Sequence, residues 1–144
     1  MNNLEQEIGE FWQGKSTNLL GGGCNAEPLD TKDRPEKVVK PNCELASSCL
    51  WCGNYRDIES LDYVWTLLSY RELMFIEKKS WGLVGKTDTK ADYVIERIAE
   101  RLNVLKEASE PFSDWIDEAE SRIASRRFHP TWGSYIDAMN DWGL

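Results

Sequence analysis

A chain of 144 residues is long enough for one domain with a hydrophobic core, and 41% of its residues are hydrophobic. Its 25 acidic and 17 basic residues give a formal net charge of −8, which argues against a protein that coats nucleic acid, because an acidic surface repels phosphates. No apolar run approaches the ~20 residues of a membrane span. The first residues also lack the basic start and apolar block of a secretory signal. We therefore expect one cytoplasmic domain, residues 1–144, with no membrane contact.

Residues 2–13 are predicted to form a short amphipathic helix. Its apolar residues recur at helical spacing and are Leu4, Ile8, Phe11 and Trp12. Residues 15–56 follow as an irregular segment that contains every cysteine of the chain. The glycine run at positions 21–23 gives the backbone freedom immediately before the first cysteine, and we interpret it as a hinge.

Four cysteines in this segment, Cys24, Cys43, Cys49 and Cys52, have the spacing C-x18-C-x5-C-x2-C. The two residues inside C-x2-C allow both sulfur atoms to turn toward one point, and the other two cysteines would complete a tetrahedron of thiolates. A closed site of this kind is typical of structural zinc, so we expect fold support rather than catalysis. An iron–sulfur cluster, disulfides and free thiols are the alternatives.

The stretch between the first two cysteines is polar and contains Pro28, Pro35 and Pro41. Such a stretch buries too little apolar surface to fold alone, so we expect the metal to hold it in place. Trp51, between the last two cysteines, is expected to shield the metal from water; an exposed anchor for a partner is the alternative.

Residues 57–144 are predicted to form a helical bundle. Asp57 is a predicted N-cap for a central helix of roughly twenty residues, which carries an apolar run at helical spacing. That run comprises Ile58, Leu61, Val64, Trp65 and Leu68. Lys78 and Lys79 suit the C-terminal end of this helix, and residues 80–87, with two glycines, are predicted to form a loop.

A third helix is predicted to follow a cap at Asp88 or Thr89 and to end at Ser109–Pro111. Its predicted buried residues are Tyr93, Val94, Ile98, Leu102 and Leu105. The charged residues between them are expected to face solvent, and these are Glu96, Arg97, Glu100 and Arg101.

Two further helices complete the prediction. Ser113 is the predicted cap of the fourth, whose inward residues are Trp115, Ile116, Ala119 and Ile123. Pro130 would stop it, and a last helix would run from Thr131 to Gly143. We find no alternating strand, so the expected fold class is mostly α: a small bundle of about four to five helices with an irregular four-cysteine metal-binding segment near the N-terminus.

The order of these motifs resembles a known family. The run Cys43…Cys49-Leu-Trp-Cys52-Gly-Asn-Tyr-Arg leads into an acidic helix containing Leu-Leu-Ser, and the chain closes on a tryptophan and a glycine near its end. This arrangement is similar to the C-terminal cysteine-containing region of integrase-like, tyrosine-recombinase-related proteins of bacterial mobile elements. The resemblance implies a role beside DNA recombination. It does not imply catalysis, because the chain has one histidine and no His-x-x-Arg motif.

One compact basic cluster stands out, formed by Arg122, Arg126 and Arg127, with His129 nearby. It is a candidate contact for a phosphate or a partner, and Trp81 in the glycine-containing loop is a second candidate contact. The simpler interpretation of the arginines is a favourable charge at a helix C-terminus, paired with Glu118 or Glu120. The acidic run from Asp114 to Glu120 is interpreted as a solvated helix face.

These patterns favour a non-catalytic zinc-binding helical module, an accessory or interaction domain related to DNA integration, with a protein partner. DNA is a disfavoured partner because of the net charge. Two alternatives use the same residues differently. One is an iron–sulfur or redox protein built on the four cysteines. The other is an acidic regulatory or inhibitor protein that binds a basic, nucleic-acid-binding partner.

Overall fold

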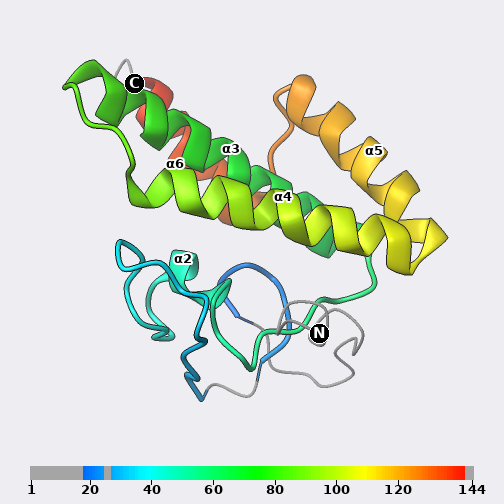
Figure 1. The fold of residues 1–144 in the computed structure, drawn as a ribbon. Helices are drawn as coiled ribbons and strands as arrows, with labels where there is room; N and C mark the ends of the chain where they lie inside the picture. Colours follow the sequence, from blue (N-terminus) through cyan, green and yellow to red (C-terminus); the bar gives the residue numbers. More distant parts are fainter. Residues whose placement is uncertain (1–17, 25–26, 142–144) are drawn as a thin grey trace.

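The computed structural model describes residues 18–24 and 27–141, and the predicted fold class is confirmed: the described chain is mostly α-helical (Figure 1). Its helices are α2 (Ala46–Cys49), α3 (Leu61–Leu83), α4 (Lys90–Ala108), α5 (Glu110–Ala124) and α6 (Pro130–Asp141). The helix predicted over residues 2–13 and the predicted helix end at Gly143 lie outside the described residues.

The longest helix, α3, is central, because it packs against α4, α5 and α6. Its N-cap is Ser60, whose Oγ accepts a hydrogen bond of 3.0 Å from Tyr63 N, so the prediction of Asp57 as the cap is wrong. The helix also continues to Leu83, beyond the start of the predicted loop. Buried side chains occur on most of its circumference, as expected for a helix covered on several sides.

The start of α4 agrees with the sequence. Thr89 is its N-cap, and Thr89 N donates a 2.9 Å hydrogen bond to Asp92 Oδ2, as in a capping box. The outward direction predicted for two of its arginines is wrong, since Arg97 is 5% exposed and Arg101 is fully buried. Both face the segment that precedes α3, and their partners are described below.

Helix α5 begins earlier than predicted. Ser109 ends α4 and is also the N-cap of α5, with Pro111 in the first turn, so Ser113 lies inside the helix rather than at its start. The helix ends at Ala124, before Pro130, which is instead the first residue of α6. Proline suits a first helical turn because its missing N–H has no intrahelical acceptor there.

We call residues 18–60 the cysteine arm and residues 61–141 the helical bundle. Figure 1 shows the described part of the cysteine arm gathered on one side of the bundle, beneath α3 and α4. The arm contributes its own buried side chains to the core, namely Leu20, Val38, Leu50, Trp51 and Tyr55. Burial of these apolar side chains therefore helps to hold the arm against the bundle, with or without a metal. The polar sequence of the arm does not predict this contribution. None of the described helices is long and apolar enough to cross a membrane.

Candidate metal centre

The pair Cys49 and Cys52 forms a tight turn at the end of α2. Cys49 is the last residue of this helix, and Cys52 N donates a 3.0 Å hydrogen bond to Cys49 O. A turn of this kind brings the two cysteines of C-x2-C to the same side of the backbone. This is the local geometry that the sequence spacing predicts.

Cys43 is placed by its neighbour Asn42. Asn42 N donates a 3.1 Å hydrogen bond to Ser48 Oγ, and Asn42 Oδ1 accepts one of 3.0 Å from Glu44 N. The first bond ties the residue before Cys43 to the buried face of α2, and the second closes a turn around Cys43. As a result Cys43 lies beside the helix that ends in Cys49.

Cys24 is brought in by backbone pairing with the residues after the C-x2-C turn. Gly23 N donates to Arg56 O at 2.8 Å, and Arg56 N donates back to Gly23 O at 2.9 Å. The pairing requires glycine: a Cβ added at Gly22 would lie 2.8 Å from Arg56 O, and Gly21 has a φ of +80°. The glycine run therefore forms a close backbone contact rather than a free hinge.

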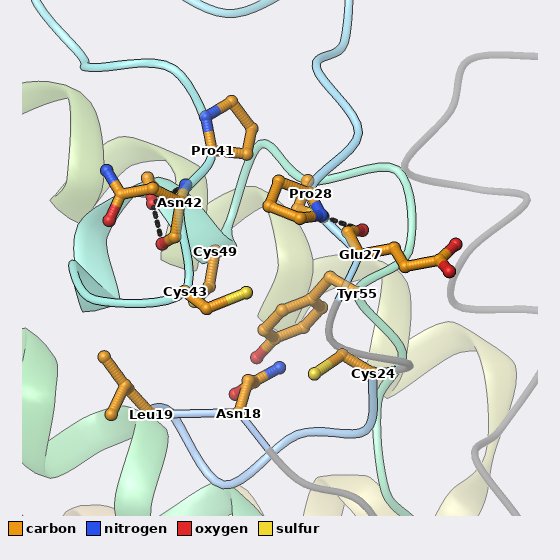
Figure 2. Close-up of a pocket in the computed structure, with 12 residues that line it drawn as sticks. Asn18, Leu19, Cys24, Glu27, Pro28, Pro41, Asn42, Cys43, Cys49 and Tyr55 are labelled. Carbon is orange, nitrogen blue, oxygen red and sulfur yellow. Dashed lines mark hydrogen bonds between the residues drawn. The ribbon is translucent and has the colours of Figure 1, made fainter.

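The four cysteines line one cavity of about 130 Å³ (Figure 2). The sulfur atoms of Cys24 and Cys43 point toward the middle of this cavity, beside the ring of Tyr55. None of the four cysteines is in a disulfide. In the described part of the chain, no three Cys, His, Asp or Glu side chains stand close enough together to hold a metal ion as placed. The residue types fit a thiolate site, and binding would require the sulfurs to move closer together.

Cys49 is the buried member of the set. Burial, and to a smaller degree the neighbouring sulfurs of Cys52, Cys24 and Cys43, raise the pKa of its thiol to about 12. A thiolate at Cys49 consequently needs a cation beside it.

Two residues at the cavity are not identified by the cysteine pattern. Asn18 fixes the glycine turn, because its Oδ1 accepts from Leu20 N at 2.9 Å and Gly22 N at 3.1 Å. Asn18 lines the cavity, and its buried Nδ2 has no hydrogen-bond partner among the described residues. An amide N–H at this place can donate to a thiolate sulfur. An asparagine before a glycine run is a turn signal, but nothing in the sequence links it to the cysteines.

Tyr55, the second such residue, connects the cavity to the helical bundle. Its hydroxyl lies 2.5 Å from that of Tyr63 on α3, and Tyr63 donates to Asp57. Asp57 in turn accepts a 2.6 Å hydrogen bond from Arg101 Nη1 on α4, and both side chains of this ion pair are fully buried. Burial raises the pKa of both tyrosines, so both hydroxyls stay protonated and available as donors.

Arg97, one helical turn before Arg101, makes a second link from α4 to the cysteine arm. Its Nε donates to Leu50 O at 3.1 Å, and its Nη1 donates to Asp33 Oδ2 at 2.8 Å. The guanidinium carbon lies 5.4 Å from the centre of the Trp51 ring. Trp51 is buried against this arginine and is not among the residues that line the cysteine cavity. The expected role of Trp51 as a shield over the metal therefore has no support in its position.

The other predicted contact residues lie elsewhere. Arg122, Arg126 and Arg127 line one pocket at the junction of α5 and α6, whereas Trp81 lines a different pocket near the end of α3. Trp81 is 38% exposed, as expected. The predicted pairing of Arg122 with Glu118 is present at 3.0 Å.

His129 Nε2 lies 3.0 Å from Asp62 Oδ1, next to α3 rather than in the cysteine cavity. The acidic residues of α5 are exposed, in agreement with a solvated face, and are Asp114, Asp117, Glu118 and Glu120.

Comparisons of the chain with protein families, with characterised proteins and with solved structures find no match.

Proposed function

We propose that this protein is a zinc-binding helical module in which Cys24, Cys43, Cys49 and Cys52 hold one zinc ion, and in which the metal has a structural role. The observation that carries the proposal is the convergence of all four cysteines on one cavity, although they come from three separate turns of the chain. Four thiolates fill the tetrahedral coordination of zinc and leave no position for a substrate.

The surroundings of the cavity support a structural role. Asn18 offers an unpartnered amide donor to a thiolate, and Tyr55 joins the cavity wall to the buried Asp57–Arg101 ion pair through Tyr63. Zinc supplies the positive charge that keeps four clustered sulfurs deprotonated. The contacts of the cysteine arm with α3 and α4 then hold the turns that carry the four cysteines at a fixed position on the bundle.

Metal analysis tests this proposal directly. We expect about one zinc per chain in protein purified without added metal, and loss of that zinc in Cys49→Ser. Val39→Ser is the matched control, because Val39 is in the same arm, is 46% exposed and does not line the cavity. A metal-free protein with the same stability would contradict the proposal. Bound iron with visible absorption would show that the cysteines hold an iron–sulfur cluster instead of zinc.

The biological setting that we propose is an accessory, non-catalytic role in DNA integration or recombination of mobile elements. Support comes from the resemblance of the cysteine and C-terminal motifs described above. With a net charge of −8, the protein is expected to act through a protein partner rather than by coating DNA.

A pull-down with a tyrosine recombinase, at low and high salt, tests this setting. We expect salt-sensitive capture of the recombinase and no shift of a DNA duplex by this chain alone. Capture of other basic proteins with equal strength, and not of the recombinase in particular, would instead favour a general acidic inhibitor.

A further inference from the structure

A second pocket, independent of the cysteines and of the proposed zinc, lies where α5 meets α6 beside α3. It has a volume of about 450 Å³ and shares no lining residue with the cysteine cavity. Its lining is basic and aromatic, and comprises Trp65, Arg122, Arg126, Arg127, Phe128, Gly133 and Asp137. Three arginines therefore border one small space in an otherwise acidic protein.

Aromatic rings lie against the guanidinium groups of two of these arginines. The guanidinium carbon of Arg122 lies 4.7 Å from the centre of the Trp65 ring, and that of Arg126 lies 5.9 Å from the centre of the Phe128 ring. The Trp65 indole also donates a 2.9 Å hydrogen bond to the carbonyl oxygen of Arg127, which fixes the turn after α5. Contact with a ring uses the face of a guanidinium group and leaves its N–H edge available for an anion.

The backbone at Arg126 is unusual for an arginine, because its φ is +59°. Arg126 N donates to Ile123 O at 2.9 Å, and Arg127 N donates to Arg122 O at 2.8 Å. These are the two bonds of a Schellman helix end, and the left-handed position between them is normally occupied by glycine. An arginine at this left-handed position costs conformational free energy that a glycine would not. We therefore infer that the side chain of Arg126 has a function.

Counted over the described residues, the lining of the pocket also carries a surplus of positive charge. Among the described residues, Arg122 has a carboxylate partner, Glu118, whereas neither Arg126 nor Arg127 lies within ion-pair distance of one. This contrasts with a chain whose 25 acidic residues outnumber its 17 basic ones. Asp137 is the single carboxylate in the described lining.

We propose that Arg122, Arg126 and Arg127 bind the phosphoryl group of a small phosphate-bearing ligand, either inorganic phosphate or pyrophosphate, or an organic phosphate ester. Planar guanidinium groups form paired, charge-assisted hydrogen bonds to phosphate oxygens. A small ligand fits better than a nucleic acid, because the exposed Glu118 of α5 pairs with Arg122 at the pocket and the whole protein carries a charge of −8. A long polyanion would meet this repulsion, and a single phosphoryl group would not.

Calorimetric titration of the full chain with inorganic pyrophosphate, and separately with adenosine diphosphate, tests the proposal. We expect saturable binding that weakens with salt. Equal affinity for the two probes would show that the phosphate alone is recognised, and tighter binding of the nucleotide would show that the ester's organic part also contributes. Both results support a phosphoryl site.

Arg126→Gly separates binding from folding. Glycine removes a guanidinium group but suits the left-handed backbone, so we expect about tenfold weaker binding with no loss of thermal stability. Arg127→Gln is expected to weaken binding to a similar extent. Lys79→Gln is the matched control, since it removes the same charge from an exposed position on α3 and should leave binding unchanged.

Three results would overturn the proposal. The first is the absence of saturable binding to either probe. The second is wild-type affinity in both arginine variants. The third is tighter binding of a DNA duplex than of pyrophosphate through the same arginines, which would make the pocket part of a nucleic-acid surface.

Discussion

The cysteine arm depends more on directional polar contacts than the helical bundle does. In the bundle, α3 is covered by three other helices, and its buried residues are mostly apolar. The described part of the arm has one helix of four residues, and two isolated backbone bridges join its turns. Its attachment to α4 relies on two buried arginines, Arg97 and Arg101. The bundle is therefore specified by apolar periodicity, whereas the arm combines its own buried apolar side chains with a few directional contacts to α4.

This difference has a consequence for stability. Loss of one apolar contact in the bundle leaves many others, so the energy is spread over the interface. Loss of one partner in the arm leaves a buried charge or a buried polar group unsatisfied, which is far more costly per contact. Metal binding would add one more local attachment, at the cysteine cavity of the arm.

Removal of the metal is expected to give the largest effect, which is a difference in amide hydrogen exchange between the cysteine arm and the helical bundle. In protein with bound zinc, chelation should raise amide hydrogen exchange strongly in the described parts of residues 18–60 and only weakly in α5 and α6. The far-ultraviolet circular dichroism should change little, because the described part of the arm contains one four-residue helix.

Hydrogen exchange followed by mass spectrometry resolves the two regions. Val39→Ser with zinc retained is the control for loop changes without loss of metal. If chelation left the exchange of the arm unchanged, the contacts to Arg97 and Arg101 would be sufficient to hold it, and the proposed structural role of zinc would be wrong.

Breaking the buried ion pair is expected to have the next largest effect. Asp57→Asn leaves Arg101 charged and fully buried, and should lower the free energy of unfolding by about 3–5 kcal/mol, measured by urea denaturation. The exposed pair of Asp30 and Arg34 provides the control, since Asp30→Asn should have little effect.

A double variant sharpens this experiment. Replacing the pair by Asp57→Asn and Arg101→Met removes both charges, keeps an acceptor for the Tyr63 hydroxyl, and should destabilise the protein less than Asp57→Asn alone. Equal losses in the single and double variants would show that packing around these side chains, rather than the isolated charge, carries the stability.

The sequence predicted the helices of the bundle more accurately than it predicted the contacts between the bundle and the arm. Apolar spacing located α3, α4 and inward residues such as Ile116 and Ala119, because these signals are local. Arg97 and Arg101 were assigned to a solvated face because a helical pattern reports residue type and not what covers that face. Their carboxylate partners, Asp33 and Asp57, lie 64 and 44 residues away in the chain.

The candidate site shows the same limit. The spacing of the cysteines predicted that they lie together, and the structure places them around one cavity. The sequence did not predict Asn18 or Tyr55 at that cavity, since both arrive through backbone pairing and side-chain contacts made elsewhere in the arm. Similarly, Asp57 has the residue type and position of a helix cap, but the buried Arg101 takes its carboxylate and Ser60 becomes the cap.

The smallest expected effect concerns the start of α4, which lies at the edge of the bundle facing the arm. The hydrogen bond from Lys78 and the backbone N–H of Thr89 hold the pKa of Asp92 below its usual range. The carboxylate therefore stabilises the fold above a pH of about 4, and this contribution is lost as the pH falls through the lowered pKa.

Asp92→Asn should lower the free energy of unfolding at pH 7 by roughly 0.5 kcal/mol, because the side chain is partly exposed to solvent. Urea denaturation at pH 7 and at a pH well below the lowered pKa measures the change. The difference between variant and wild type should disappear at the lower pH, since both then carry an uncharged side chain at position 92. A difference that stayed constant with pH would assign the stabilisation to side-chain packing at the helix start, and the edge of the bundle would then resemble its apolar interior rather than the polar attachment of the arm.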